Sequence, residues 1–227
     1  MVSTTYSQHR GRLETYFDKT AAKTWETLTS DAPVSGIRAT VRAGRDAMRD
    51  TLLSWLPQDM HGMRLLDAGC GTGALAVAAA ERGADVVAVD VAGSLVDIAR
   101  RRAPEGLAID WRVGDMLSHE LGRFDHVVAM DSLIHYPARD IVRVVELLAA
   151  RTERSIAFTI APRTPALSAM HAIGGLFPRA DRAPAIAPVS PAKLERMLGD
   201  SLPGGHVGRR ARISKGFYIS QAVEVLP

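Results

Sequence analysis

The chain has 227 residues, 47% of them hydrophobic, which is enough for one large α/β domain with a sizeable core. A formal net charge of +3 is too small to indicate a nucleic-acid partner by itself. The single cysteine, Cys70, excludes an internal disulfide and favours a reducing compartment. No run of about 18 apolar residues is present, so we expect a cytoplasmic protein without a transmembrane helix; peripheral contact with a membrane stays open.

Residues 1–60 predict a basic helical segment ahead of the core. We expect one helix from Ser7 to Leu28 and a second from Val34 to Trp55, separated by a turn that contains Pro33. Apolar residues recur at helical spacing along the second helix. A second row at the same spacing consists of Arg38, Arg42, Arg45 and Arg49. Such rows are most often solvated, and the alternative is recognition of a ligand carboxylate, because guanidinium pairs bidentately with carboxylates.

The stretch from Arg64 to Gly73 predicts a buried strand over 64–68 that ends in a tight glycine turn, with a helix over 74–82 behind it. Glycine permits the positive φ angles of such a turn and lets a ligand approach the bare backbone. The amides of the turn and of the helix N-terminus favour a negative group. The spacing of Gly69, Gly71 and Ala74 also fits the dinucleotide fingerprint, so a NAD-dependent oxidoreductase stays an alternative.

Two details favour S-adenosylmethionine (SAM) as the ligand of this turn. Asp67 lies at the strand end, where its carboxylate can reach a ligand ammonium directly or through water, and the third glycine, Gly73, leaves the turn flat and open. The pattern from Asp67 through Gly69, Cys70 and Gly71 to Gly73 resembles the first motif of class I SAM-dependent methyltransferases. A turn that serves only the chain reversal is the plain alternative.

The next two strands supply further candidates for the cofactor site. An apolar run over 86–90 ends in Asp90, beside Val91, where an acid can accept both ribose hydroxyls of NAD or SAM. Its alternative is an N-cap for the helix expected over 95–102. A strand over 108–113 precedes Asp115 and Met116. The resemblance to class I methyltransferases implies that this acid faces the adenine amino group and that Met116 covers the ring; a capped turn is the alternative.

The fourth strand, over 124–130, leads into a loop that we expect beside the reactive methyl group. Ligands of open α/β sheets lie beyond the carboxyl ends of the strands, so the loop over 131–137 belongs to the site. His135 is its polar candidate, although an isolated histidine is ordinarily a hydrogen-bonding residue. A helix over 140–151 and a strand over 154–160 complete the alternation, which predicts a doubly wound, mostly parallel sheet.

The segment 161–208 breaks that alternation and holds seven of the 12 prolines. We expect an apolar helix over 167–177 and another that begins at Ser190, together forming a lid over a large, flat, apolar substrate. Simple cover of the core is the alternative. Two strands around Gly216, over 208–215 and 217–224, end the chain as an antiparallel hairpin. The expected units are a helical arm over 1–60, a SAM-binding core over 61–160, the lid over 161–208 and the last strands over 209–227.

Several stretches together resemble the family of magnesium-protoporphyrin IX O-methyltransferases over nearly the whole chain. They are the arm segments Tyr16–Ala21 with Trp25 and Val34–Arg49, the motifs Leu65–Gly73 and Asp131–Pro137, the lid residues Phe177-Pro178 and Arg182–Pro184, and Gly216–Tyr218 near the end. The resemblance implies a Rossmann-like class I fold and transfer of the SAM methyl to one propionate of magnesium protoporphyrin IX. The monomethyl ester so formed is a step of chlorophyll and bacteriochlorophyll synthesis.

The resemblance also implies roles for single residues. It implies that Tyr16 of the arm and His135 of the fourth-strand loop are catalytic residues, and we expect them to orient the propionate carboxylate rather than to deprotonate it. Substrate-binding candidates are Ile134, Tyr136, Met170 and Phe177. Cofactor-binding candidates are Asp67, Gly69, Cys70, Gly71, Gly73, Asp90, Val91, Asp115, Met116, Asp131 and Arg38.

No protein-bound metal is expected, since the magnesium belongs to the substrate. A transient handover from magnesium chelatase, with the arginine row as a docking face, and a place at the photosynthetic membrane are further implications. An O-methyltransferase for another carboxylate or phenolate and a non-catalytic SAM-binding module stay open.

Overall fold

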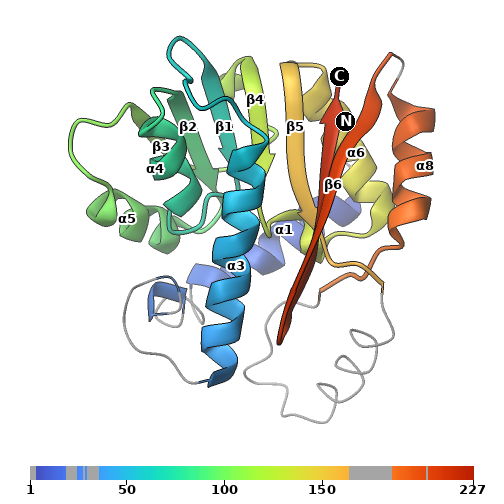
Figure 1. Ribbon diagram of the computed structural model, residues 1–227, viewed down its shortest axis with the longest axis horizontal. Coiled ribbons are helices and arrows are strands. Elements are labelled where there is room, and N and C mark those ends of the chain that lie inside the picture. The colour runs from blue at the N-terminus through green and yellow to red at the C-terminus, as the bar shows by residue number, and fades with distance from the viewer. Residues whose placement is uncertain (1–3, 19–24, 28, 30–35, 164–185, 203) are drawn as a thin grey trace.

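A seven-stranded sheet forms the centre of the computed structural model, which describes residues 4–18, 25–27, 29, 36–163, 186–202 and 204–227 (Figure 1). The strands are β1 (Arg64–Ala68), β2 (Asp85–Asp90), β3 (Ile109–Val113), β4 (Phe124–Ala129), β5 (Thr152–Ile160), β6 (His206–Lys215) and β7 (Tyr218–Leu226). The helices are α1 (Thr4–Tyr16), α3 (Gly36–Ser54), α4 (Ala74–Ala80), α5 (Gly93–Arg102), α6 (Ala138–Ala149) and α8 (Pro191–Ser201), with short 3-10 turns η2 (His119–Leu121) and η3 (Leu133–His135).

The strands lie in the order β3-β2-β1-β4-β5-β7-β6. Strands β1 to β5 pair in parallel, β7 pairs antiparallel with β5, and β6 pairs antiparallel with β7. The predicted doubly wound sheet with a C-terminal antiparallel hairpin is therefore confirmed. The strand order reverses between β1 and β4, and in open α/β sheets ligands bind beyond the carboxyl ends of the strands at this switch point.

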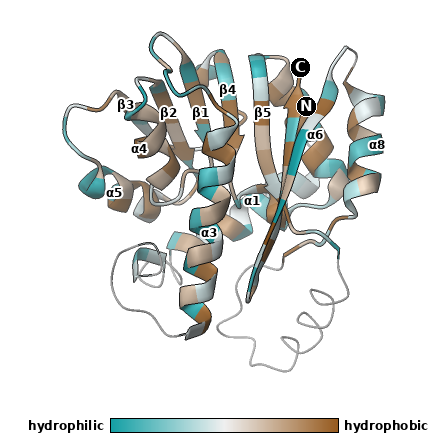
Figure 2. Cartoon of the chain, in the orientation of Figure 1, coloured by the Kyte–Doolittle hydropathy of each residue, from teal (hydrophilic) through white to brown (hydrophobic). Residues whose placement is uncertain are grey.

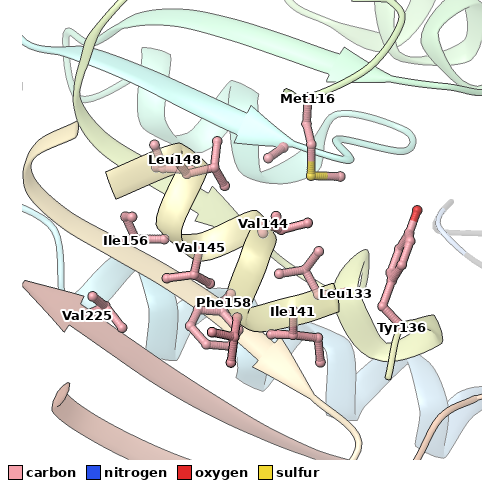
Figure 3. Close-up of a cluster of buried hydrophobic side chains, with 14 of the residues drawn as sticks. Met116, Leu133, Tyr136, Ile141, Val144, Val145, Leu148, Ile156, Phe158 and Val225 are labelled. Atoms are coloured by element: carbon pink, nitrogen blue, oxygen red, sulfur yellow. The ribbon is translucent and has the colours of Figure 1, made fainter. Parts of the chain in front are cut away.

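Alternate residues of each strand point to opposite faces, so the sheet has a hydrophobic core on both sides. Leu66 of β1 belongs to one core together with Val127 of β4 and the apolar sides of α6 and α8. Its neighbour Leu65 belongs to the other core, which α3 and α4 cover. Figure 3 shows the first core, where Val145 of α6 packs near Phe158 of β5. In Figure 2 brown marks much of the inner strands, such as β2 and β4, whose middle residues are buried, whereas the edge strand β6 is largely hydrophilic and exposed.

The N-terminal arm differs from the single long helix predicted over Ser7–Leu28. Helix α1 begins earlier, at Thr4, and ends at Tyr16, and a separate helical turn covers residues 25–27; residues 19–24 and 28 lie outside the described part. A straight helix would separate residues 17 and 25 by about 12 Å along its axis. The rings of Phe17 and Trp25 instead lie 5.7 Å apart, and both pack on α5, so the chain folds back to bury them.

The expected lid is only partly described. Residues 164–185, and with them the helix predicted over 167–177, lie outside the described residues. Helix α8 packs against α6, with Leu194 and Leu198 fully buried in the core, so this end of the segment covers the sheet. Pro162 and Val189 form a parallel bridge that brings the two ends of the segment together.

The C-terminal hairpin projects past the carboxyl edge of the sheet toward α3 (Figure 1). Its turn contains Gly216 at φ 56°, and a side chain there would lie 2.7 Å from Thr40 of α3. The predicted hairpin is confirmed, two residues longer at each end than expected. None of the helices in the described ranges is long and apolar enough to cross a membrane.

Candidate active site

A cavity of about 430 Å³ lies at the carboxyl edge of the sheet, where the arrows of β1, β2, β4 and β5 point in Figure 1. The strand ends form its floor, and the arm, α3 and the β7 end of the hairpin form its walls. Its size and its mostly apolar wall are those of a small-molecule site. The cavity brings together residues from positions 6 to 220 of the chain.

The glycine turn after β1 has the backbone that the sequence predicted. Gly69, Gly71 and Gly73 have φ angles of 84°, 54° and 82°. A Cβ at Gly69 would lie 2.4 Å from the Cβ of Ser132, so the turn and the loop after β4 can touch only because that side chain is missing. At Gly71 nothing lies within 4 Å of the same position, which leaves the backbone open to a ligand.

Asp90, at the end of β2, is held by the backbone on both of its oxygens. Oδ2 accepts the N–H of Gly71 and Oδ1 accepts the N–H of Ala92, both at 2.9 Å. Burial raises the pKa of this carboxyl above its ordinary value. Asp90 and Val91 line the cavity, and each carboxylate oxygen keeps a lone pair for a hydroxyl donor.

Asp67 lies behind the glycine turn rather than in the cavity wall, with 2% of its surface exposed. Burial, reinforced by the charge of Asp90, raises its pKa to about 7. Its Oδ2 is buried and has no hydrogen-bond partner among the described residues. This oxygen suits a cationic ligand, directly or through water. Burial also raises the pKa of the Cys70 thiol, which therefore stays protonated and is no nucleophile.

Asp115, after β3, is the point where the arm joins the cofactor side of the cavity. Its Oδ1 accepts the Tyr6 hydroxyl at 2.7 Å, and its Oδ2 accepts Arg10 Nη1 at 2.6 Å. The Tyr6 ring stacks on Tyr136 with centroids 5.1 Å apart, while Met116 lines the cavity. Sequence reasoning missed Tyr6 and Arg10. Their spacing of four on one helix was the available signal, but the helix was expected to begin only at Ser7.

The two residues expected to be catalytic reach the same cavity. His135 is 9% exposed at the end of η3, and its ring meets Phe17 at 6.4 Å between centroids. The Tyr16 ring meets the Phe17 ring edge-on, with centroids 5.2 Å apart. Ile134 and Tyr136 line the cavity beside them. The structure thus places the arm tyrosine and the loop histidine against the same aromatic ring.

Asp131 opens the loop after β4 with a positive φ of 54°, unusual for a residue other than glycine. It forms an ion pair with Arg45 Nη1 at 2.9 Å and accepts hydrogen bonds from Tyr218 at 3.0 Å and Thr159 at 3.2 Å. Arg45 lines the cavity. Asp131 is therefore neutralised by a helix residue and fixed by two neighbouring strands.

The arginine expected at the cofactor, Arg38, is exposed and is not among the described residues that line the cavity. Arg45 lies two helical turns, or about 10 Å, further along α3 and occupies the cavity instead. Two other members of the row form local contacts, Arg42 with the carbonyl of Thr27 and Arg49 with Asp46.

Two substrate candidates, Met170 and Phe177, lie outside the described residues. Within the ranges that are described, no group of three His, Cys, Asp or Glu side chains is arranged to hold a metal ion.

The strand order, the glycine turn after β1 and the acid at the end of β2 define a class I SAM-dependent methyltransferase. Residues 65–154 match a family model described as "Methyltransferase domain". Residues 129–227 match one described as "Magnesium-protoporphyrin IX methyltransferase C-terminus". The chain is 50% identical over 225 residues to the magnesium-protoporphyrin O-methyltransferase of Rhodobacter capsulatus, with 98% of each chain covered. It belongs to the family of magnesium-protoporphyrin O-methyltransferases, and the resemblance noted in its sequence is confirmed.

Two further relatives agree with this assignment. The chloroplastic magnesium protoporphyrin IX methyltransferase of Arabidopsis thaliana is 30% identical over 93% of this chain and 69% of its own. The crystal structure of the Synechocystis enzyme with bound SAH superposes with a TM-score of 0.83 at 27% identity. That match covers 95% of this chain and 98% of the other, so the arm and the last strands share the fold as well as the core.

Proposed function

We propose that this protein transfers the methyl group of SAM to a propionate carboxylate of magnesium protoporphyrin IX and forms the monomethyl ester. The observation that carries the proposal is the 50% identity to a magnesium-protoporphyrin O-methyltransferase over 98% of both chains. The mostly apolar cavity in which the rings of Tyr16 and His135 both pack against Phe17 supports it. An O-methyltransferase for a smaller carboxylate or a phenolate is the alternative.

The described residues fit the cofactor. The open backbone at Gly71 admits a ligand to the turn, and the free lone pairs of Asp90 suit the ribose hydroxyls. The orphaned oxygen of Asp67 suits the ammonium of the amino-acid end. Asp115 and Met116 lie where the adenine is expected. We assign Asp67, Asp90 and Asp115 to the ammonium, the ribose and the base, so that the three acids lie at or just beyond the carboxyl ends of three adjacent strands.

The reaction needs alignment more than acid–base chemistry. A propionic acid has a pKa close to the reference value of about 4.3 for Glu, so at neutral pH it is already an anionic nucleophile. SAM supplies an activated methyl group, which the carboxylate oxygen attacks in line while the carbon–sulfur bond breaks and its electron pair goes to sulfur. The protein must hold the carboxylate on this line, and such positioning can contribute several kcal/mol.

We assign this positioning to His135 and Tyr16. Both are polar groups on a mostly apolar wall, and the rings of both pack against Phe17. Hydrogen bonds from them would orient the carboxylate without protonating it. The aromatic residues of the arm exclude water, which would otherwise solvate the anion and weaken it as a nucleophile. His135→Ala should therefore lower turnover much more than it weakens SAM binding, and an equal loss of both would make His135 structural.

The direct test is to mix the protein with SAM and magnesium protoporphyrin IX and to follow the product by mass spectrometry. One added methyl group that depends on SAM would establish reaction and substrate together. Binding of S-adenosylhomocysteine without methylation of the porphyrin, but with methylation of a smaller acid or a phenol, would favour the alternative. Stabilisation against heat by NAD and not by S-adenosylhomocysteine would overturn the proposal.

We further propose that the protein receives its porphyrin from magnesium chelatase in a transient contact and that it acts at the surface of the photosynthetic membrane. Arg38 is exposed near the start of α3, whereas Arg42, Arg45 and Arg49 have partners in this protein. Co-sedimentation with anionic vesicles and pull-down with the chelatase subunits would test the two contacts separately. Loss of either contact on Arg38→Glu would support a docking role for this end of α3.

A further inference from the structure

We propose that Arg45 is the carboxylate receptor of the cavity, held ready for its ligand by Asp131 and Trp25. The inference rests on the proposed function, because both compounds of that reaction carry carboxylates. SAM has an α-carboxylate, and magnesium protoporphyrin IX has two propionates, of which one is not methylated. Each of these anions needs a counter-charge in an apolar cavity.

Arg45 is the only arginine or lysine among the described residues that line the cavity. The other charged groups on that wall are the carboxylates Asp90 and Asp131. Elsewhere on the described wall a ligand carboxylate would meet apolar side chains, hydroxyl groups, the ring of His135 or a like charge. Arg45 therefore marks the place on this wall where a permanent positive charge can stabilise an anion.

The guanidinium of Arg45 has donors to spare. It carries five N–H bonds in a planar fork, and its one hydrogen bond in the described structure runs from Nη1 to Asp131 Oδ2 at 2.9 Å. Its flat face lies 4.7 Å from the ring centre of Trp25, which fixes the plane of the fork without using a donor. The remaining edge can pair bidentately with a carboxylate.

The partner of Arg45 is itself fixed from two strands. Asp131 accepts the Tyr218 hydroxyl at 3.0 Å and the Thr159 hydroxyl at 3.2 Å, and its own N–H donates to Thr159 at 2.7 Å. The pair is well sheltered, with 24% of the Arg45 side chain and 7% of the Asp131 side chain exposed. These contacts hold Arg45 in position before a ligand arrives, which lowers the entropy cost of binding.

Gly44 explains how α3 comes close enough for this contact. A Cβ at this position would lie 2.5 Å from the Cβ of Tyr218, so the helix rests directly on the tyrosine that also bonds Asp131. The next residue, Arg45, is thereby brought to the cavity. One small residue on the helix and one aromatic residue on β7 thus set the position of the receptor.

Arg45 could bind either the α-carboxylate of the cofactor or the propionate that is not methylated, and the two possibilities predict different effects of removing Arg45 on ligand binding. If Arg45 takes the α-carboxylate of the cofactor, its loss weakens the binding of cofactor and cofactor product. If it takes the propionate that is not methylated, its loss weakens the porphyrin alone. In the second case Arg45 also explains the single methylation, because a turned-over monoester would present an uncharged ester to the guanidinium.

The experiment compares Arg45→Gln with the wild type and with Arg49→Gln, a control on the same helix whose ion pairs are with Asp46 and Asp50. Calorimetry measures the binding of S-adenosylhomocysteine and of 5′-methylthioadenosine, which lacks the amino-acid part. Steady-state assays give the KM for magnesium protoporphyrin IX and the inhibition constant of its dimethyl ester, which has no free carboxylate.

A cofactor role predicts that Arg45→Gln weakens S-adenosylhomocysteine roughly 10- to 100-fold and leaves 5′-methylthioadenosine within about twofold. A substrate role predicts a KM raised by a similar factor, with the dimethyl ester and S-adenosylhomocysteine unchanged. Either result supports the proposal. Arg45→Lys, which keeps the charge but loses the fork, should show a smaller loss on the same ligand and guards against a glutamine variant that does not fold.

The proposal is overturned if a folded Arg45→Gln variant binds every ligand within twofold of the wild type. It is equally overturned if the two carboxylate-free probes weaken as much as the others, because Arg45 would then be structural. A wild-type protein that does not methylate the porphyrin would refute the proposed function alone. The two adenosine compounds would still report whether Arg45 recognises a carboxylate.

Discussion

Replacing Asp67 with Asn should stabilise the free protein and weaken its hold on the cofactor. The carboxylate is 2% exposed, one of its oxygens has no partner in the described structure, and its pKa is raised to about 7. In the folded protein it therefore keeps its proton up to near-neutral pH, whereas in the unfolded chain it ionises near 3.8. Between these two values the unfolded state binds fewer protons, so the free energy of unfolding falls as pH rises.

The size of this effect follows from the gap between the two pKa values. A gap of about three pH units, at about 1.4 kcal/mol for each, corresponds to at most about 4 kcal/mol. The cost is absent below pH 4, grows through the acid range and is complete above pH 7. The amide side chain of the Asp67→Asn variant cannot ionise, so the variant does not lose this free energy of unfolding. The difference in unfolding free energy between the variant and the wild type should therefore grow by a few kcal/mol between pH 4 and pH 7.

Urea unfolding of both proteins at pH 4.5, 6 and 8 would measure that advantage, with Asp97→Asn as a control for loss of a surface charge. Calorimetry with S-adenosylhomocysteine over the same range should show the opposite pH dependence: the wild-type affinity should rise with pH, whereas the wild-type stability falls. A bound ammonium favours the ionised carboxylate, so wild-type affinity should fall by up to about tenfold for each pH unit below 7. A stability difference that does not change with pH would refute the reasoning.

Three further changes have definite expected outcomes. Gly44→Ala should lower S-adenosylhomocysteine affinity or turnover several-fold, because the new Cβ would lie 2.5 Å from Tyr218. Gly11→Ala is the control and should change neither, because nothing lies within 4 Å of its Cβ position; binding and activity assays compare the two variants. Tyr6→Phe removes a 2.7 Å hydrogen bond to a carboxylate and should loosen the arm by about 1–2 kcal/mol, measured as faster limited proteolysis. Burial lowers the pKa of His126, so wild-type stability should decline as pH falls below about 6.5, and His126→Asn should remove this decline in urea unfolding.

The strands were predictable because their signals are local. Val86–Val89 is a continuous apolar run, as a strand covered on both faces requires, and it lies within β2. The glycines after β1 and the acids at the ends of β1 and β2 were predictable for the same reason. Each depends on a backbone geometry that a few neighbouring residues determine.

The choice of arginine was not predictable, because it depends on how α3 lies against the sheet. Arg38 and Arg45 are two turns apart and lie on nearly the same side of the helix, so periodicity cannot separate them. The contact of Gly44 with Tyr218 brings Arg45 rather than Arg38 to the cavity, and Gly44 and Tyr218 are 174 positions apart in the sequence. Tyr6 and Asp115 are likewise 109 residues apart, and their hydrogen bond leaves no trace in either local sequence.

The arm contacts the core at the loops that are expected to hold the adenosine of the cofactor. Asp18 accepts the backbone N–H and the hydroxyl of Ser94 at the start of α5, four residues after Asp90, the acid proposed for the ribose. This interaction caps a helix that has no side-chain cap of its own. Tyr6 reaches Asp115 in the next loop. Since the same short loops contact the arm and are expected to hold the nucleoside, we expect the contacts of the arm to be energetically linked to cofactor binding.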